Sequence, residues 1–352
     1  MSDLLLNNSN RSKSFTFSNF LLYLCAVGLN IDSSSFTIGS FHLSPVTLVL
    51  VLYVLSCIKY LNQFTILCKK YRKVVTYVFL WFVLLILINL ININEISRRV
   101  VPIDILFCII LFFVSLNHLD QDESAHKYLL AGFVSGGLLS ALLYYFGIGV
   151  EYDVTMGRLF FFGMNPNNVG CMICLSFVII LYNYIIKGKY SFIVKLVFLF
   201  LLIPCLLMIF ATASRTAFLA LIISIITIVI YSNRGLKTGR KLVVWLVLII
   251  GLYFAYRLFL SSEVLYSRIV RSTEENDVSG RDGIWQRLIK VFFAHPFGMG
   301  QTGYTKYVFL TTQSTAIGGA ESPHNVFLEV ALYTGFTLIY YHFLLLRCYL
   351  FR

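Results

Sequence analysis

Three arginines and one histidine stand at polar breaks in a largely apolar chain. They are Arg158, Arg215, Arg281 and His324. A guanidinium group is a rigid, permanently charged fork that binds phosphate through paired hydrogen bonds. Histidine is the side chain best suited to proton transfer near pH 7. Together these residue types could hold a phosphorylated group and take a proton from an attacking hydroxyl.

Arg215 interrupts the longest apolar stretch of the chain. It lies in ATASRTAF, within about forty otherwise apolar residues from Phe192 to Tyr231. A charge at membrane depth is costly, which makes such a residue a functional hypothesis. We expect Ser214 or Thr212 to cap the helix that follows, and a helix N-terminus beside an arginine favours an anion. The alternative is a tight connection between two spanning helices, with Arg215 among the lipid headgroups.

Arg158 opens a second polar segment, GRLFFFGMNPNNVG, over residues 157–170. Its Asn-Pro pair predicts a turn, and we expect Asn167 or Asn168 to cap the following helix. The alternative reading is a well-capped re-entry of the chain into the membrane.

Arg281 begins a third segment, RDGIWQRLIKVFFA. Ile284, Leu288 and Phe292 fall on one face of a helix, with charged residues over much of the rest. This pattern predicts an amphipathic interfacial helix near 281–294, stopped by Pro296 and the glycines after it. An anion is favourable at the helix start, where Arg281 stands.

His324 follows Pro323 in ESPHNVFLEVALYTG, just before a final apolar run. We expect the other five histidines to be structural, whereas His324 re-enters the face of the protein where the arginines gather. It is therefore the candidate base, with Glu321 in reserve.

The composition identifies the scaffold that must position these groups. The chain has 352 residues, of which 59% are hydrophobic and 12% charged, against about 25% charged in soluble domains. We find no nucleotide-binding loop, no acidic metal pair and no nucleic-acid motif. The sequence predicts one polytopic all-α membrane domain over 1–352, with a long loop at 261–324. Apolar runs predict about ten spans, at 15–31, 43–62, 74–93, 100–117, 127–149, 166–186, 192–212, 216–231, 241–260 and 325–346.

Lysine and arginine in the loops predict the orientation. With the N-terminus in the cytoplasm, seventeen of the 28 basic residues fall inside and eleven outside. Nine of the eleven outer residues are arginines, whereas lysines predominate inside. An arginine-rich outer face suggests a phosphorylated ligand there; the alternative is chance composition with some headgroup anchors.

The order of these outer motifs resembles the O-antigen polymerase and O-antigen ligase superfamily. The matching features are an outer Ser-Arg before a helix, an R-x-x-x-W helix from Arg281, the turn HPFGMG, H-N-x-x-L from His324, and upstream G-R with G-x-N-P-N. The resemblance covers about residues 157–335. It depends on the order of the motifs and their common outer placement rather than on any single motif.

The resemblance implies a metal-independent glycosyltransferase of the GT-C kind, without a cofactor. It would act at the periplasmic face of the bacterial inner membrane on glycans linked to undecaprenyl diphosphate. Arg215 and Arg281 would hold the donor diphosphate, and His324 would activate the acceptor hydroxyl. The expected substrate-binding residues are Arg158, Asn167, Glu321 and Asn325. The implied partners are the lipid-linked oligosaccharide, membrane lipids and, for a polymerase, a chain-length regulator protein, but no nucleic acid.

Three functions fit this chemistry to different degrees. The leading interpretation is a polymerase that transfers a growing glycan onto the next lipid-linked repeat unit. The second is a ligase that transfers the finished glycan to lipid A-core with the same donor. A transporter of the lipid-linked sugar is the third, but it would place ionisable residues at the membrane midplane, and here they collect on one face.

Overall fold

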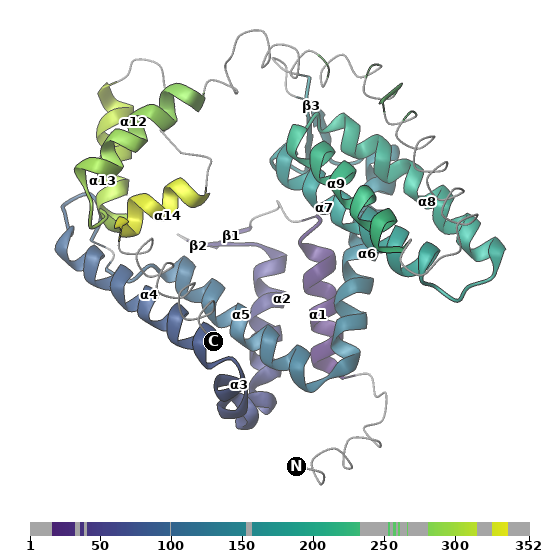
Figure 1. Ribbon diagram of the computed structural model, residues 1–352, viewed down its shortest axis with the longest axis horizontal. Coiled ribbons are helices and arrows are strands. Elements are labelled where there is room, and N and C mark those ends of the chain that lie inside the picture. The colour runs from purple at the N-terminus through teal and green to yellow at the C-terminus, as the bar shows by residue number, and fades with distance from the viewer. Residues whose placement is uncertain are drawn as a thin grey trace. The chain divides into compact units, whose positions relative to one another are not determined.

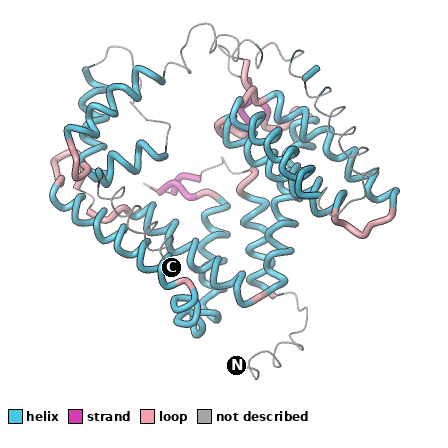
Figure 2. The backbone as a smooth tube through the Cα atoms, in the orientation of Figure 1, coloured by secondary structure: helices cyan, strands magenta, loops and turns pink. Residues whose placement is uncertain are grey.

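The computed structural model describes residues 16–31, 36–38, 41–98, 100–152, 157–232, 281–314 and 326–336, with isolated helical positions between 253 and 266. The described chain is helical apart from two small hairpins (Figure 1, Figure 2). It divides into two compact units. Unit 1 comprises residues 1–60 and 118–270, and unit 2 comprises 61–117 and 271–352.

Unit 1 is a helical bundle with both hairpins. Its elements are α1 (Phe17–Gly28), β1 (Phe36–Ile38), β2 (Phe41–Leu43), α2 (Pro45–Ser56), α6 (Glu123–Tyr145), β3 (Val150–Tyr152), β4 (Leu159–Phe161), α7 (Pro166–Ile179), η3 (Ile180–Ile186), α8 (Phe192–Ala211) and α9 (Arg215–Ser232). The strands pair antiparallel within each hairpin, β1 with β2 and β3 with β4.

Unit 2 combines helices from two distant parts of the sequence. Its elements are α3 (Phe64–Lys70), α4 (Arg72–Ile91), most of α5 (Ile103–Gln121), α12 (Arg281–Ala294), α13 (Gly300–Ser314) and α14 (Val326–Thr334). The short helix η2 (Cys57–Gln63) crosses the boundary between the units.

The predicted all-α membrane class is confirmed. Among the described residues, five helices are long and apolar enough to cross a membrane: Pro45–Asn62, Arg72–Ile91, Glu123–Tyr145, Pro166–Ile186 and Phe192–Ala211. Three shorter apolar helices, Phe17–Gly28, Ile105–Gln121 and Arg215–Tyr231, cover other predicted spans. Half of the predicted span 325–346 and all but isolated positions of 241–260 lie outside the described residues, so the total of about ten spans stays a prediction.

Glycines on α6 allow its neighbours to approach closely. A Cβ at Gly132 would lie 2.5 Å from the carbonyl oxygen of Tyr23 in α1, and one at Gly136 would lie 2.9 Å from that of Val27. Glycines four residues apart are the small-residue pattern that brings membrane helices into backbone contact. The α1–α6 contact is therefore fixed by the absence of side chains at these two positions.

The junction between α5 and α6 is held by a carboxylate. Asp122 caps α6 by accepting from the backbone N–H of Ser124 at 2.8 Å, and it accepts from Asn19 Nδ2 of α1 at 2.8 Å. Partial burial opposes ionisation of Asp122, but these hydrogen bonds outweigh it and lower the pKa of the carboxyl group.

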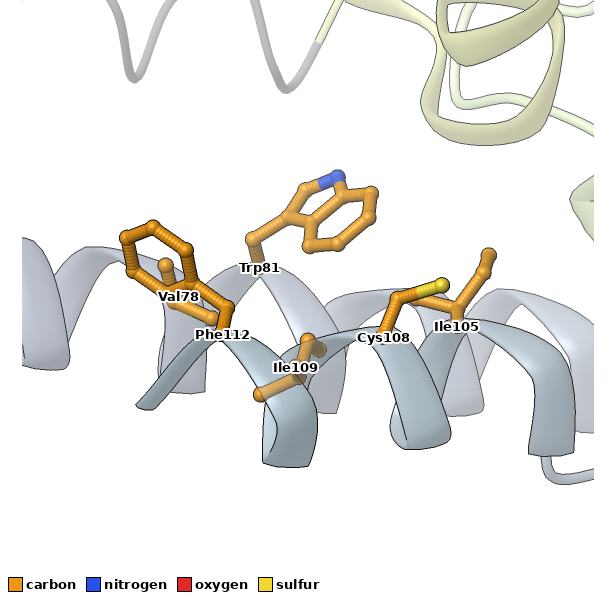
Figure 3. Close-up of a pocket in the computed structure, with 6 residues that line it drawn as sticks. All are labelled: Val78, Trp81, Ile105, Cys108, Ile109 and Phe112. Carbon is orange, nitrogen blue, oxygen red and sulfur yellow. The ribbon is translucent and has the colours of Figure 1, made fainter. Parts of the chain in front are cut away.

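An apolar groove of about 430 Å³ runs along unit 2 (Figure 3). Its lining comes from α4 and α5 and comprises Val78, Trp81, Ile105, Cys108, Ile109 and Phe112. Apart from the Cys108 thiol, these side chains are not ionisable. The groove offers contacts for hydrocarbon but no groups for acid–base or phosphate chemistry, so the candidate site lies elsewhere.

Replacing Gly132 with Val should separate α1 from α6, because the new side chain would overlap the backbone of Tyr23. Overpacking of this kind costs about 1–3 kcal/mol. We expect a lower thermal unfolding temperature of the purified protein in detergent and less protein in membranes. The control is Leu139→Val on the same helix, where the side chain is exposed; equal loss in both variants would contradict the close-packing interpretation.

Candidate active site

The predicted site residues fall in both units. Arg158, Asn167 and Arg215 lie in unit 1, and Arg281 is the first residue of α12 in unit 2. Glu321, His324 and Asn325 lie outside the described residues.

Arg158 is fixed in place by the strand that follows it. Leu159 and Phe161 of β4 are both fully buried, in the core that α7 also helps to form. Gly157, with φ of 61°, turns the chain just before Arg158 in a conformation that suits glycine. The backbone at Arg158 is therefore anchored on the strand side by buried apolar side chains.

The Arg158 side chain joins two other segments of unit 1. Its Nε donates to the backbone carbonyl of Thr212 at 3.3 Å, and its Nη2 donates to Asn167 Oδ1 at 3.0 Å. Thr212 directly follows α8, and Asn167 lies in the first turn of α7. The arginine thus brings together residues that are 9 and 54 positions away in the sequence.

The prediction that Asn167 or Asn168 caps α7 is wrong. The cap is Asn165, whose Oδ1 accepts from the backbone N–H of Asn167 at 2.9 Å. Proline lacks an N–H and its fixed φ suits the first helical position, so the helix begins at Pro166. Asn167 consequently stands inside the first turn, where its side chain can accept from Arg158.

The start of α9 agrees with one of the two capping alternatives. Ser214 Oγ accepts from the backbone N–H of Ala217 at 3.3 Å, so Ser214 caps the helix that Arg215 begins. Thr212 instead donates through Oγ1 to the carbonyl of Ile209 at 2.7 Å. The capping serine leaves Arg215, which is partly buried, at the first helical position.

The connection between α8 and α9 has an unusual backbone. Ala213 is fully buried and has φ of 47°, in the left-handed region that residues with a Cβ seldom adopt. Such a conformation persists only where the surroundings hold it, and it is common at functional sites. Here it lies directly after the carbonyl group that accepts from Arg158.

The first turns of α7 and α9 pack against each other. A Cβ at Gly170 would lie 2.8 Å from Ala217 Cβ and 2.9 Å from Thr212 Oγ1. The N-terminal ends of both helices therefore lie at the same end of unit 1, with Arg158 in contact with one of them and Arg215 part of the other. Helix N-termini carry partial positive charge, so this arginine cluster, Arg158 and Arg215 with the two helix starts, suits an oxyanion.

Helices α12, α13 and α14 form a small core of their own in unit 2. Its buried members are Leu288, Phe292, Met299, Tyr304 and Leu332. The apolar face predicted for α12 thus packs on protein, while Ile289 and Phe293 of the same helix remain exposed at 44% and 63%. That α12 anchors at a membrane surface stays a prediction. The exposed side chains of Ile289 and Phe293 could make that contact.

The HPFGMG turn connects these three helices. The backbone N–H of Met299 donates to the carbonyl of Leu332 at 2.9 Å, and that of Phe336 donates to the carbonyl of Pro296 at 2.8 Å. A Cβ at Gly298 would lie 2.5 Å from the carbonyl oxygen of Tyr333. The motif glycine is therefore required because the backbone of α14 passes directly over the turn.

The same contacts set the direction of α12 and α14. The rings of Phe292 and Phe336 pack at a tilt of 53° with centroids 4.6 Å apart, so the C-terminal ends of the two helices meet. Ile284 and Leu328, near the N-terminal ends, pack on the same core. The start of α12 at Arg281 and the start of α14 at Val326 thus lie toward the same end of this three-helix unit.

Asn89 was not predicted to have a role, yet it is fully buried in α4 and binds the start of α13. Its Oδ1 accepts from the backbone N–H of Thr302 at 3.1 Å and from Thr302 Oγ1 at 3.2 Å. Gly300 fits here because a Cβ would lie 2.3 Å from Asn89 Oδ1. The available signal was an asparagine within an apolar span, since such residues often bind a neighbouring helix.

One protein-family model matches part of the chain. The O-antigen ligase family model matches residues 196–342, a range that includes Arg215, Arg281 and His324 and leaves out Arg158.

A curated relative is the ComP-specific O-oligosaccharyltransferase of Acinetobacter baylyi. It is 27% identical over 145 residues, which are 40% of this chain and 26% of the relative. The match therefore spans about a quarter of that relative's length. No solved structure matches the chain. The family match and the relative together confirm the resemblance of this helical membrane protein to the O-antigen polymerase and ligase superfamily.

Proposed function

We propose that the protein is a surface-polysaccharide polymerase of the bacterial inner membrane. It transfers a growing glycan from undecaprenyl diphosphate onto the next lipid-linked repeat unit, at the periplasmic face. The observation that carries the proposal is the arginine cluster, where Arg158 and Arg215 accompany the paired N-terminal turns of α7 and α9. Fixed positive charge of this kind is suited to a diphosphate.

The reaction needs charge stabilisation and one proton transfer. The acceptor hydroxyl oxygen attacks the anomeric carbon of the donor sugar, and the bond from that carbon to the diphosphate oxygen breaks. Undecaprenyl diphosphate leaves with the bonding electron pair, and Arg158, Arg215 and Arg281 oppose its charge. Preorganised donors of this type each contribute about 10²–10³-fold to kcat. The arginines supply positive charge in the role that a metal ion has in other phosphate sites.

The hydroxyl proton passes to His324, which acts as general base and contributes about 10²–10⁴-fold. Glu321 is the reserve base in this proposal, and Asn325 contacts the substrate beside it. Asn167 contributes to donor binding through the arginine that it contacts.

A ligase is the second candidate, because the matching family is described as O-antigen ligase and the relative is named an O-oligosaccharyltransferase. Both names fit transfer of a glycan to a hydroxyl acceptor. A ligase would use the same donor and the same arginine cluster, and would differ in the acceptor. A chain-length regulator is a proposed partner only for the polymerase.

Deleting the gene from the native host should leave lipopolysaccharide with a core that bears one repeat unit and no ladder on a gel. Export and ligation would still work, whereas extension would fail. Bare core, with polymer accumulating on the lipid carrier, would favour the ligase. An unchanged ladder would contradict both assignments to lipopolysaccharide.

Re-expressing the Arg215→Ala variant in that strain should not restore the ladder, because the donor diphosphate loses a charge-assisted contact. We expect the transfer rate to fall about 10²-fold or more. Arg215→Lys should restore it only partly, since an ammonium group cannot make the paired contact. Lys189→Ala, which removes an exposed charge in the loop before α8, is the control. Full activity of Arg215→Ala at normal membrane levels would make Arg215 a headgroup anchor.

His324→Ala should abolish extension while donor binding persists, because the histidine acts on the acceptor. The rate of transfer should fall about 10²–10⁴-fold, measured with purified protein and lipid-linked donor. His295→Ala is the matched control, since His295 is an exposed histidine of the same unit. A fully active His324→Ala variant would remove this residue from the mechanism.

A further inference from the structure

Among the contacts of the Arg158 guanidinium group are two described acceptors that carry no net charge. One is the carbonyl oxygen of Thr212 at 3.3 Å from Nε, and the other is the carboxamide oxygen of Asn167 at 3.0 Å from Nη2. A carboxylate at either place would orient the side chain but would also cancel its charge. These two neutral acceptors fix the direction of the group and do not themselves oppose its positive charge.

Both acceptors are themselves held in place. Thr212 is fully buried, its hydroxyl is bonded to Ile209, and the left-handed residue Ala213 follows it. Asn167 is fixed through its backbone N–H, which donates to Asn165 Oδ1 at 2.9 Å. The two acceptors therefore form a rigid binding position for the Arg158 side chain.

We propose that Asn167 and the Thr212 carbonyl are positioning groups that hold Arg158 for the lipid diphosphate. This inference rests on the proposed function. A free arginine side chain has many rotamers, and ordering it at the moment of binding reduces affinity. Acceptors that order the arginine side chain before the ligand binds remove most of that cost. Asn167 acts on the donor through Arg158, and its own contact with the diphosphate is not required.

A double-mutant cycle separates this role from direct contact with the ligand. The full-length protein in nanodiscs is titrated with inorganic pyrophosphate and, separately, with undecaprenyl diphosphate. The variants are Arg158→Gln, Asn167→Ala and the two combined. We expect Asn167→Ala to weaken binding about tenfold and Arg158→Gln to weaken it about 10–100-fold. The double variant should bind as Arg158→Gln does, because Asn167 has nothing left to position.

Asn167→Asp gives a second test, because this substitution should preserve stability while it weakens pyrophosphate binding. The carboxylate would pair with Arg158 and keep it oriented, but would cancel its charge. We expect thermal unfolding at or above the wild-type temperature, together with weaker pyrophosphate binding than in Asn167→Ala. Higher affinity in Asn167→Asp than in Asn167→Ala would overturn the inference.

A helix cap at the other end of unit 1 provides the control for general loss of stability. Ser191 caps α8 about 30 Å along that helix from Thr212. Ser191→Ala should lower stability and leave the dissociation constant for pyrophosphate unchanged.

The outcomes distinguish failure of the inference from failure of the proposed function. Equal weakening by Asn167→Ala in the wild-type and Arg158→Gln backgrounds would mean direct contact and would overturn the positioning role, with the donor site intact. Normal binding in Arg158→Gln but loss in Arg215→Ala would also overturn it and keep the function. Unchanged binding in both arginine variants would overturn the proposed donor site itself.

Discussion

The close approach of α7 and α9 at Gly170 is the constraint on which the arginine cluster depends. With no Cβ at this position, the first turn of α7 reaches Ala217 and Thr212 of the segment that begins α9. The starts of the two helices are then neighbours, so acceptors from both segments can orient the side chain of Arg158. A larger residue at Gly170 would move α7 outward and separate the two acceptors of Arg158. The grouping of positive charge at this site thus depends on an uncharged packing contact at Gly170.

In unit 2, polar contacts between chain segments accompany the close approaches at glycine. Asn89 binds the start of α13, and backbone hydrogen bonds connect the HPFGMG turn to the end of α14. The backbone contacts fix the C-terminal ends of α12 and α14 beside the turn. Because the two helices share a direction, their first residues, Arg281 and Val326, lie toward the same end of the three-helix unit. The motif glycines 298 and 300 are explained by these backbone and side-chain approaches rather than by contact with a ligand.

Local patterns in the sequence predicted the helices well, because span length and apolar content act within one segment. The run 192–212 corresponds to α8, 74–93 to α4, and the polar Ser-Arg pair to the start of α9. Patterns that depend on register across segments were not predicted. The contact of Arg158 with Asn167 requires knowing that Pro166 begins the helix, and its contact with Thr212 requires the left-handed backbone at Ala213. A local pattern can single out Asn89 as a polar residue in an apolar span, but it cannot identify Thr302 as its partner 213 positions away.

The discontinuity of unit 2 has a consequence for how the protein is made. Its two stretches, 61–117 and 271–352, are separated by residues of unit 1. At a synthesis rate of about 5–20 residues per second, Thr302 leaves the ribosome about 10–40 s after Asn89. Throughout that interval the carboxamide of Asn89 in α4 lacks Thr302, the residue that it binds in the folded protein. Unit 1 can begin to pack while the chain is still growing, whereas the helix that Asn89 caps joins only after Thr302 has been made. Unit 2 is therefore completed only after the residues of unit 1 have been synthesised.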